Sequence, residues 1–351
     1  MDEFLLLHNS SAGEECSYTH LKMSNETVTA VHASHISVPM QAIVTFIYLL
    51  GILGNSAALW YIIHPRSKTR NPRYSLLLTM LLTNDLTAVV GMGILMYIGI
   101  YYPSISRTRT LCMVRALWRA FGLGSGCIVS VMAVERFFAL AKPFYYSKHV
   151  TVSRLRRATV TLWLFNLAIV VLPIFGIGAY YNKEKGYCVR YKNATETIDI
   201  IYAYVYMGFG VLLCMCLLLS NFSVVATLTM RQRSGVSKPH VLVRRHSRNK
   251  DLEATSTAEE TAFARVMIYI SLSFLFSWLP QLVSVPVAQL IKAESCKKYF
   301  KIADLILAIH FIVDPYIYIL QKFIVFKPSE WCRKPNSRTS SVKTSNELCS
   351  L

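Results

Sequence analysis

The chain has 351 residues, of which 54% are hydrophobic and only 16% carry a charged side chain, and its formal net charge is +18. This apolar excess, with a positive mean hydropathy, excludes an ordinary soluble domain and predicts a protein that crosses a membrane several times. The basic balance is compatible with nucleic acid, an anionic membrane surface or an acidic ligand, and the positions of the charges decide among these.

Residues 1–38 are polar and contain two N-glycosylation sequons, at Asn9 and Asn25, and a third sequon lies at Asn193. Because sequons are used only on the lumenal side, they indicate an extracellular N-terminal tail. The apolar run that begins at Phe4 is too short for a signal peptide. The first spanning helix is therefore expected to act as its own insertion signal.

Seven apolar segments follow, and each is long enough to cross the ~30 Å hydrocarbon core of a bilayer as a helix. They cover residues 39–63, 74–101, 112–141, 157–180, 199–229, 263–291 and 302–321. The third segment is interpreted as the central helix because Gly122, Gly124, Ser125 and Gly126 let neighbouring helices approach closely. A single signal anchor is the alternative for this segment, and the six other apolar runs disfavour it.

The predicted fold is therefore an all-α membrane protein, a bundle of seven transmembrane helices with a short amphipathic helix after the seventh span. Residues 39–325 form the membrane domain, 231–260 a polar connection within it, and 326–351 a polar tail. Lys and Arg concentrate in the first, third and fifth connections and in the tail, which the positive-inside rule assigns to the cytoplasm. Basic residues spread around membrane exits disfavour a nucleic-acid partner and favour a multi-pass protein of the plasma membrane.

The cysteines separate by side, and only those outside the cell are expected to form lasting disulfides. We predict that Cys112, at the outer end of the third span, pairs with Cys188 in the loop after the fourth. A second pairing, of Cys16 with Cys296, is a further hypothesis. Cys332, in the cytoplasmic tail, is a candidate palmitoylation site, or simply a cytosolic thiol.

Two carboxylates lie inside predicted spans, Asp85 in the second and Asp314 in the seventh, and Ser125 of the third could add an oxygen. A charge at that depth needs a partner. Such a group could hold a sodium ion or share a proton, and the alternative is a hydrated polar core without a specific ion. No other cofactor is expected.

Prolines interrupt the last two predicted spans beside bulky or acidic side chains. Pro280 follows Trp278 closely in the sixth span, and Pro315 follows Asp314 in the seventh, with Tyr318 one turn later. Proline inside a helix removes a backbone hydrogen bond and produces a kink. These kinks are candidate hinges, although proline kinks are also common as static structure.

Glu135 and Arg136 end the third span on the cytoplasmic side, and Glu260 precedes the sixth span on the same side. Arg136 could pair with Glu260 in one conformation and release it in another. A simple interfacial anchor is the alternative for the Glu-Arg pair.

These positions together resemble the rhodopsin-like (class A) G-protein-coupled receptors over residues 40–325. The matching motifs are Gly54-Asn55, Asp85, Cys112, Glu135-Arg136-Phe137, Trp163, Trp278-Leu279-Pro280 and Asp314-Pro315 with Tyr318. The resemblance implies a receptor rather than an enzyme, with a ligand pocket in the outer half of the bundle and a heterotrimeric G protein at the inner face. It also implies arrestin and receptor kinases as partners, in addition to the membrane lipids.

Within that superfamily the chain is most similar to the prostanoid (prostaglandin E-type) receptors. The similar strings are Phe121-Gly122-Leu123, Met132-Ala133-Val134-Glu135-Arg136, Lys142-Pro143-Phe144-Tyr145-Tyr146, Leu172-Pro173 with Gly176-Ile177-Gly178, Asn221 and Tyr318-Ile319-Leu320. In those receptors an arginine nine residues before the Asp-Pro motif binds the ligand carboxylate, and here that position is Leu305. The departure is compatible with a divergent, invertebrate-like member.

Another cation is then needed for an anionic ligand. Arg115 and Arg119 lie one turn apart on the outer half of the third span, and further lysines and arginines surround the outer mouth. A basic vestibule favours an anionic ligand through steering and a charge-assisted bond. Arg119 is the hypothetical replacement anchor, with Arg115, Trp118, Tyr187 and Trp278 as further pocket candidates. The alternative is that both arginines snorkel to lipid headgroups.

Three classes of function remain. The first is a receptor for an anionic lipid, such as a prostaglandin, and the second is a receptor of the same fold for another ligand, such as a peptide. An amine is disfavoured because no carboxylate lies in the outer half of the third span. The third class is a transporter or a light-driven pump. It is disfavoured because the sequence shows no evident inverted repeats, and because residues 302–321 contain no lysine, which a retinal-based pump would need. His310 is interpreted as a satisfied polar core residue rather than a metal ligand.

Overall fold

The computed structural model describes residues 38–64, 71–184, 186–233, 248–291 and 297–331. Asn9, Asn25, Cys16, Cys296 and Cys332 lie outside these residues, and so does the side chain of Glu260. The elements in chain order are α1 (Val38–Ile63), α2 (Pro72–Tyr101), α3 (Pro103–Ser106), α4 (Arg109–Ala141), α5 (Pro143–His149), α6 (Val152–Val171), η2 (Leu172–Phe175), β1 (Tyr181–Asn182), β2 (Tyr187–Cys188), η3 (Tyr191–Asn193), α7 (Thr197–Arg233), α8 (Arg248–Leu290) and α9 (Lys297–Trp331).

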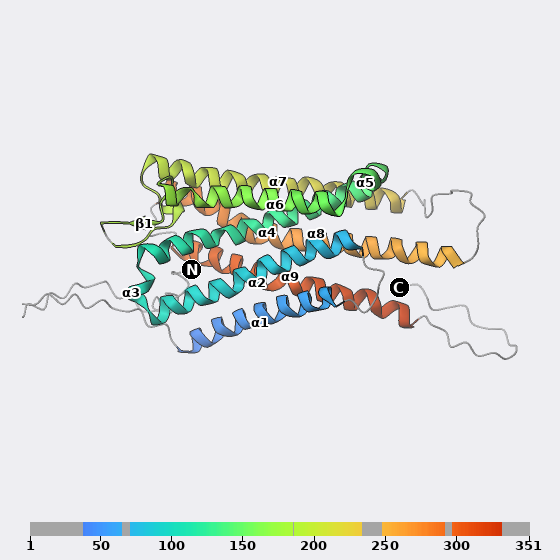
Figure 1. The fold of residues 1–351 in the computed structure, drawn as a ribbon, viewed down its shortest axis with the longest axis horizontal. Coiled ribbons are helices and arrows are strands. Elements are labelled where there is room, and N and C mark those ends of the chain that lie inside the picture. The colour runs from blue at the N-terminus through green and yellow to red at the C-terminus, as the bar shows by residue number, and fades with distance from the viewer. Residues whose placement is uncertain (1–37, 65–70, 185, 234–247, 292–296, 332–351) are drawn as a thin grey trace, which may run out of the picture.

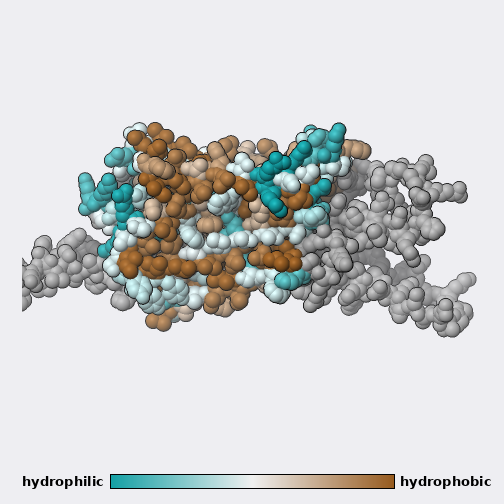
Figure 2. All heavy atoms as spheres, viewed as in Figure 1, coloured by the Kyte–Doolittle hydropathy of each residue, from teal (hydrophilic) through white to brown (hydrophobic). Residues whose placement is uncertain are grey.

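Seven of these helices are long and apolar enough to cross a membrane, and they lie lengthwise beside one another in one bundle (Figure 1). Apolar side chains cover the middle of the visible face, whereas hydrophilic residues gather toward its two ends (Figure 2). This band is the pattern that a bilayer selects, because lipid tails contact apolar side chains and water contacts the ends. The predicted seven-helix membrane bundle is confirmed.

The helices begin where the sequence supplies caps. Proline occupies the first positions of α2, α3 and α5, where its missing N–H costs nothing. The Thr108 hydroxyl accepts from the Leu111 N–H at the start of α4, and the Thr151 hydroxyl accepts from the Arg154 N–H at the start of α6.

The fourth span differs from its predicted range of 157–180, because it covers Val152–Phe175. The Thr151 cap starts the helix one turn earlier than hydropathy suggests. At the other end Gly176 takes a left-handed conformation, with φ at 91°, which ends the helical segment. In the stretch predicted as a separate amphipathic helix, the structure continues α9 to Trp331.

The central position predicted for the third span holds for α4. In its most apolar window 72% of the residues are buried, against 28% for the spans of α6 and α7. Gly122 lies against Trp278, Gly124 against Trp163 and Gly126 against Phe274. Each glycine therefore makes room for an aromatic ring of another helix.

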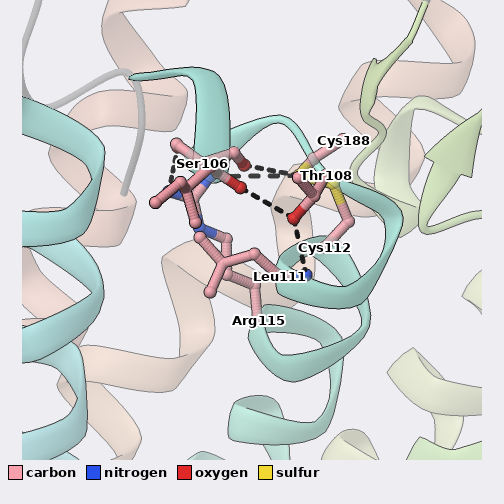
Figure 3. Close-up of a disulfide and its surroundings, with 7 residues drawn as sticks. Ser106, Thr108, Leu111, Cys112, Arg115 and Cys188 are labelled. Atoms are coloured by element: carbon pink, nitrogen blue, oxygen red, sulfur yellow. Dashed lines mark hydrogen bonds between the residues drawn. A yellow bond between two sulfur atoms is a disulfide. The ribbon is translucent and has the colours of Figure 1, made fainter. Parts of the chain in front are cut away.

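The predicted disulfide between Cys112 and Cys188 is confirmed, with a Cα–Cα distance of 5.2 Å. It joins α4 to strand β2, which pairs antiparallel with β1 (Figure 3). We call this part of the bundle the disulfide end, and the opposite part, where Glu135 and Arg136 lie, the Arg136 end. The Arg115 guanidinium donates to the Ser106 hydroxyl at 2.6 Å beside the disulfide (Figure 3).

The glycine contacts of α4 generate a test of packing. A Cβ at Gly126 would collide with the Phe274 ring, whereas a Cβ at Gly208 of α7 would meet no atom within 4 Å. Overpacking of this kind costs about 1–3 kcal/mol. We expect Gly126→Ala to lower the thermal unfolding temperature of the purified protein and its surface expression, while Gly208→Ala leaves both unchanged. Equal behaviour of the two variants would contradict the proposed packing.

Candidate functional site

The side chain of Arg119 enters the disulfide-end half of the bundle from α4. Its guanidinium carbon lies 4.9 Å from the centre of the Tyr191 ring, within the range of a cation–π contact. One guanidinium nitrogen, Nη1, is buried and has no hydrogen-bond partner among the described residues. A buried donor without a partner is costly, so this nitrogen is suited to an acceptor that the protein itself does not supply.

Three tyrosines surround this guanidinium. The Tyr191 ring packs edge-on against Tyr206, with centres 4.8 Å apart, and Tyr202 lies one turn before Tyr206 on α7. All three are buried. Burial raises the pKa of Tyr191 to about 12, although the positive charge of Arg119 works in the opposite direction. The Tyr191 phenol therefore stays protonated at neutral pH and can donate a hydrogen bond.

Two side chains of α8 complete this region, which we call the Arg119 cluster: Arg119, Tyr191, Tyr202, Tyr206, Gln281 and Trp278. Gln281 is buried, and its Oε1 has no hydrogen-bond partner in the part of the chain that is described. Trp278 is also buried, lies against Gly122 and stacks on Phe274. The cluster thus offers guanidinium and hydroxyl donors above an aromatic floor, an arrangement suited to a carboxylate carried on an apolar body.

The loop around η3 covers the cluster and is fixed to the last two helices. Arg190 forms an ion pair with Asp304 of α9, and the Lys192 ammonium lies 4.1 Å from the centre of the Phe300 ring. The Gln289 amide of α8 donates to the carbonyls of Lys192 and Ala194, at 2.9 and 3.1 Å. These contacts hold the basic side chains of Arg190 and Lys192 on the disulfide-end side of the bundle, where Arg119 also lies.

The other sequence-predicted pocket residues lie elsewhere. Arg115 contacts Ser106 at the end of α3 and the sulfur of Cys188. The Trp118 indole donates to the carbonyl of Ala88 on α2 and packs closely over Gly91. Tyr187 is 44% exposed on β2. The structure therefore brings Arg119 and Trp278 into one region and gives Arg115 and Trp118 packing contacts of their own.

Sequence reasoning missed Tyr191, Tyr202, Tyr206 and Gln281. A weak signal exists, because Tyr202 and Tyr206 are spaced by four residues and so share one face of a helix. Tyr191 lies between two basic residues of a loop, and no local pattern places that loop over the bundle.

A second polar group lies deeper, between α2, α4 and α9. The Ser125 hydroxyl donates to Asp85 Oδ1 at 2.9 Å, and the Asn84 amide lies 3.3 Å from the same oxygen. Asp314 is buried, with His310 Nδ1 3.4 Å from its Oδ1. Asp85 Oδ2 and both carboxylate oxygens of Asp314 have no hydrogen-bond partner among the described residues.

At the Arg136 end, Glu135 and Arg136 form a buried ion pair. The Tyr146 hydroxyl of α5 also donates to Glu135, and the Arg73 guanidinium lies 4.6 Å from the centre of the Tyr146 ring. Burial and the neighbouring Glu135 raise the pKa of Tyr146, so this phenol remains a donor. Glu135 is thus held by two partners, and Arg136 is held by Glu135.

The two candidate hinges are also contacted by other helices. Pro280 lies inside α8, and its carbonyl accepts from the Tyr299 hydroxyl of α9 at 2.6 Å. Pro315 of α9 is close to Gly54 of α1, and the Tyr318 ring is buried with its centre 6.2 Å from that of Tyr74.

Residues 54–318 match the model of the family described as 7 transmembrane receptor (rhodopsin family). The prostaglandin E2 receptor EP3 subtype of Homo sapiens is 24% identical over 323 residues, covering 85% of this chain and 80% of that protein. The EP2 subtype of Canis lupus familiaris is 26% identical over 348 residues, covering 92% and 88%. The crystal structure of squid rhodopsin superposes with a TM-score of 0.63 at 17% identity, covering 84% of this chain and 87% of that one.

The loop contacts generate a prediction about local stability. Asp304→Asn removes the negative partner of Arg190, and we expect the backbone amides of residues 189–193 to exchange with solvent about tenfold faster, equivalent to ~1.4 kcal/mol. Hydrogen-exchange mass spectrometry on the purified protein measures this. Asp199→Asn is the control, because Asp199 accepts from the Gly178 N–H instead. Unchanged exchange at 189–193 in Asp304→Asn would refute the role of the ion pair.

Proposed function

Since the chain belongs to the rhodopsin family of seven-transmembrane receptors, we propose that it binds an anionic lipid at the Arg119 cluster and activates a heterotrimeric G protein. The ligand class is a carboxylate on an oxygenated apolar chain, a prostaglandin such as prostaglandin E. The family consists of receptors rather than enzymes, and seven spans make this a multi-pass membrane protein.

The single observation that carries the ligand proposal is the buried, unpartnered Nη1 of Arg119 among tyrosines. In a region with little water, a carboxylate acceptor there would form a charge-assisted hydrogen bond, which is stronger than a neutral one. Tyr191 and Tyr202 would donate to the carboxylate or to oxygens of the chain, and Trp278 would contact the apolar part. Arg119 would thus bind the ligand carboxylate, in place of the arginine that prostanoid receptors carry at the position of Leu305.

The names of the relatives support the same ligand class. Both quoted relatives are prostaglandin E2 receptors, and each alignment covers most of both proteins. Leu305 lies next to Asp304, whose carboxylate already pairs with Arg190. A carboxylate ligand that approached that part of α9 would find Arg190 already paired, which favours an anchor on α4 instead.

The proposed orientation places the disulfide end outside the cell, with the sequon at Asn193 exposed there. The Arg136 end then meets the G protein, and afterwards arrestin and receptor kinases. An agonist that binds the active arrangement more tightly shifts the population toward it. In that arrangement α8 moves about Pro280, and Arg136 is released from Glu135 to contact the G protein.

Arg119→Gln tests the ligand proposal. Removing a charge-assisted hydrogen bond of ~1.5–3 kcal/mol is expected to reduce agonist potency roughly 10- to 150-fold. The measurement is cyclic AMP and calcium output of expressing cells challenged with a panel of prostaglandins and other anionic lipids. Arg119→Lys, which keeps the charge, is expected to lose less.

Arg115→Gln is the matched control, because it removes the same charge one turn away while its native partner is Ser106. Surface expression is measured for every variant. Equal potency of Arg119→Gln and the native receptor would overturn the anchor. Silence toward all anionic lipids, with a response to a peptide, would replace the ligand class by the peptide alternative.

We also propose that Asp85, Asp314 and Ser125 hold a sodium ion. Asp85 Oδ2 and both carboxylate oxygens of Asp314 lack hydrogen-bond partners among the described residues, and hard cations prefer oxygen ligands. The ion would supply a positive charge between two carboxylates that otherwise repel each other.

Sodium is therefore expected to raise the thermal unfolding temperature of the purified receptor relative to potassium at equal ionic strength. Binding that adds ~1 kcal/mol corresponds to about 3 °C. In Asp85→Asn the difference between the two salts is expected to vanish. Equal unfolding temperatures of the native receptor in both salts would contradict the sodium proposal. The two carboxylates would then be stabilised by a shared proton or by bound water.

A further inference from the structure

A groove of about 730 Å³ lies between α8 and α9, which run side by side through the bundle (Figure 1). This volume is within the range of sites for small molecules, ~300–1,000 Å³. Much of its lining faces outward, since Phe276 is 70% exposed and Tyr269 55% exposed. Side chains on this outer face of a membrane bundle contact lipid, so an occupant would enter from the bilayer.

Polar side chains interrupt the apolar lining of this groove. His310, Ser273 and Ser277 all contribute to it. His310 is only 1% exposed, and its Nδ1 lies 3.3 Å from the Ser273 hydroxyl oxygen. Its other nitrogen, Nε2, has no hydrogen-bond partner within the described ranges. His310 is too buried for an occupant to reach, whereas the Ser273 hydroxyl is only partly buried in the groove. Because hydrocarbon offers no water, an occupant with an oxygen atom at this depth would give Ser273 a hydrogen-bond partner that lipid tails do not supply.

A positive charge lies at one end of the groove. Arg265 lines it near the Arg136 end, is exposed, and forms no ion pair with any residue whose side chain is described. Along α8, Ser273 lies eight residues beyond Arg265, or ~12 Å, and Ser277 lies ~18 Å beyond it. Half of the ~30 Å hydrocarbon core is ~15 Å, so the groove extends through about one leaflet.

We propose that this groove is a second binding site, for an oxygenated fatty acid taken from the adjacent leaflet. Its carboxylate would pair with Arg265, and a hydroxyl or keto oxygen would bond Ser273. The ~12 Å between these points corresponds to roughly ten carbons of extended chain, because the zigzag makes the advance per carbon smaller than the ~1.5 Å bond length. An ordinary phospholipid matches Arg265 but carries no oxygen at that depth.

This site is separate from the Arg119 cluster, and it lies between α9 and the part of α8 that moves in the mechanism proposed above, so its effect on signalling rests on that proposed function. A ligand that contacts both α8 and α9 in the present arrangement stabilises that arrangement over one in which α8 has moved away. Occupation therefore reduces the response to an agonist bound at Arg119.

Photo-crosslinking tests the proposal. The probe is 12-hydroxyoctadecanoic acid bearing a diazirine and an alkyne, added to the full-length receptor in phosphatidylcholine nanodiscs, with labelled peptides identified by mass spectrometry. We expect labelling within 269–276 and 306–313. Arg265→Gln is expected to reduce it at least fivefold, whereas Arg156→Gln, a change of another exposed arginine on α6, leaves it unchanged.

Competition identifies the occupant. Unlabelled 12-hydroxyoctadecanoic acid is expected to displace the probe at least fivefold better than octadecanoic acid or the methyl ester of the hydroxy acid. Displacement by phosphatidylserine but not by the hydroxy acid would assign the groove to a phospholipid and overturn the proposal. Labelling spread over all helices and insensitive to Arg265→Gln would also overturn it. Loss of labelling in Arg119→Gln would mean that the probe binds the Arg119 cluster instead of the groove, and would overturn the proposal.

Discussion

The close approach of neighbouring helices to α4 is the constraint on which the other features of the bundle depend. Gly122, Gly124 and Gly126 each leave space for an aromatic ring from α6 or α8. In lipid the hydrophobic effect does not drive helices together, so their association depends on van der Waals packing. The missing side chains at these positions let the helices pack closely enough for that attraction to act. The same closeness lets Ser125 of α4 reach Asp85 of α2. Tight packing and polar pairing in the core thus have one origin.

Much of the fold could be predicted from the sequence, because hydropathy, basic loops and the side of each cysteine are local properties of the chain. The seven spans and the Cys112–Cys188 bridge follow from them. The fourth span was misplaced by about one turn because its ends are set by Thr151 and Gly176 rather than by hydropathy. Capping and a left-handed glycine act on single residues, and a window average does not detect them.

The candidate site was less predictable, since it is assembled from distant segments. Helical spacing places both Arg115 and Arg119 on one face, and only packing distinguishes them, because Arg115 contacts Ser106 and Cys188 whereas Arg119 lies against the Tyr191 ring. The buried tyrosines come from η3 and α7, and their meeting depends on how the loop crosses the bundle. Fold membership alone does not identify the ligand, because one fold serves many ligands. The chemistry of Arg119 and its neighbours therefore carries more information than the family match.

The hydrogen bond from Tyr299 to the carbonyl of Pro280 has a mechanical consequence. It ties the backbone of α8 at Pro280 to α9, so we expect the part of α8 beyond the proline and the start of α9 to turn as one body. The part from Ala264 to Pro280 is then a lever ~24 Å long with its fulcrum at the proline. A rotation of roughly 10° at the fulcrum displaces α8 at Ala264 by ~4 Å. Small changes near Trp278, two residues from the fulcrum, are thereby magnified at the far end of the helix.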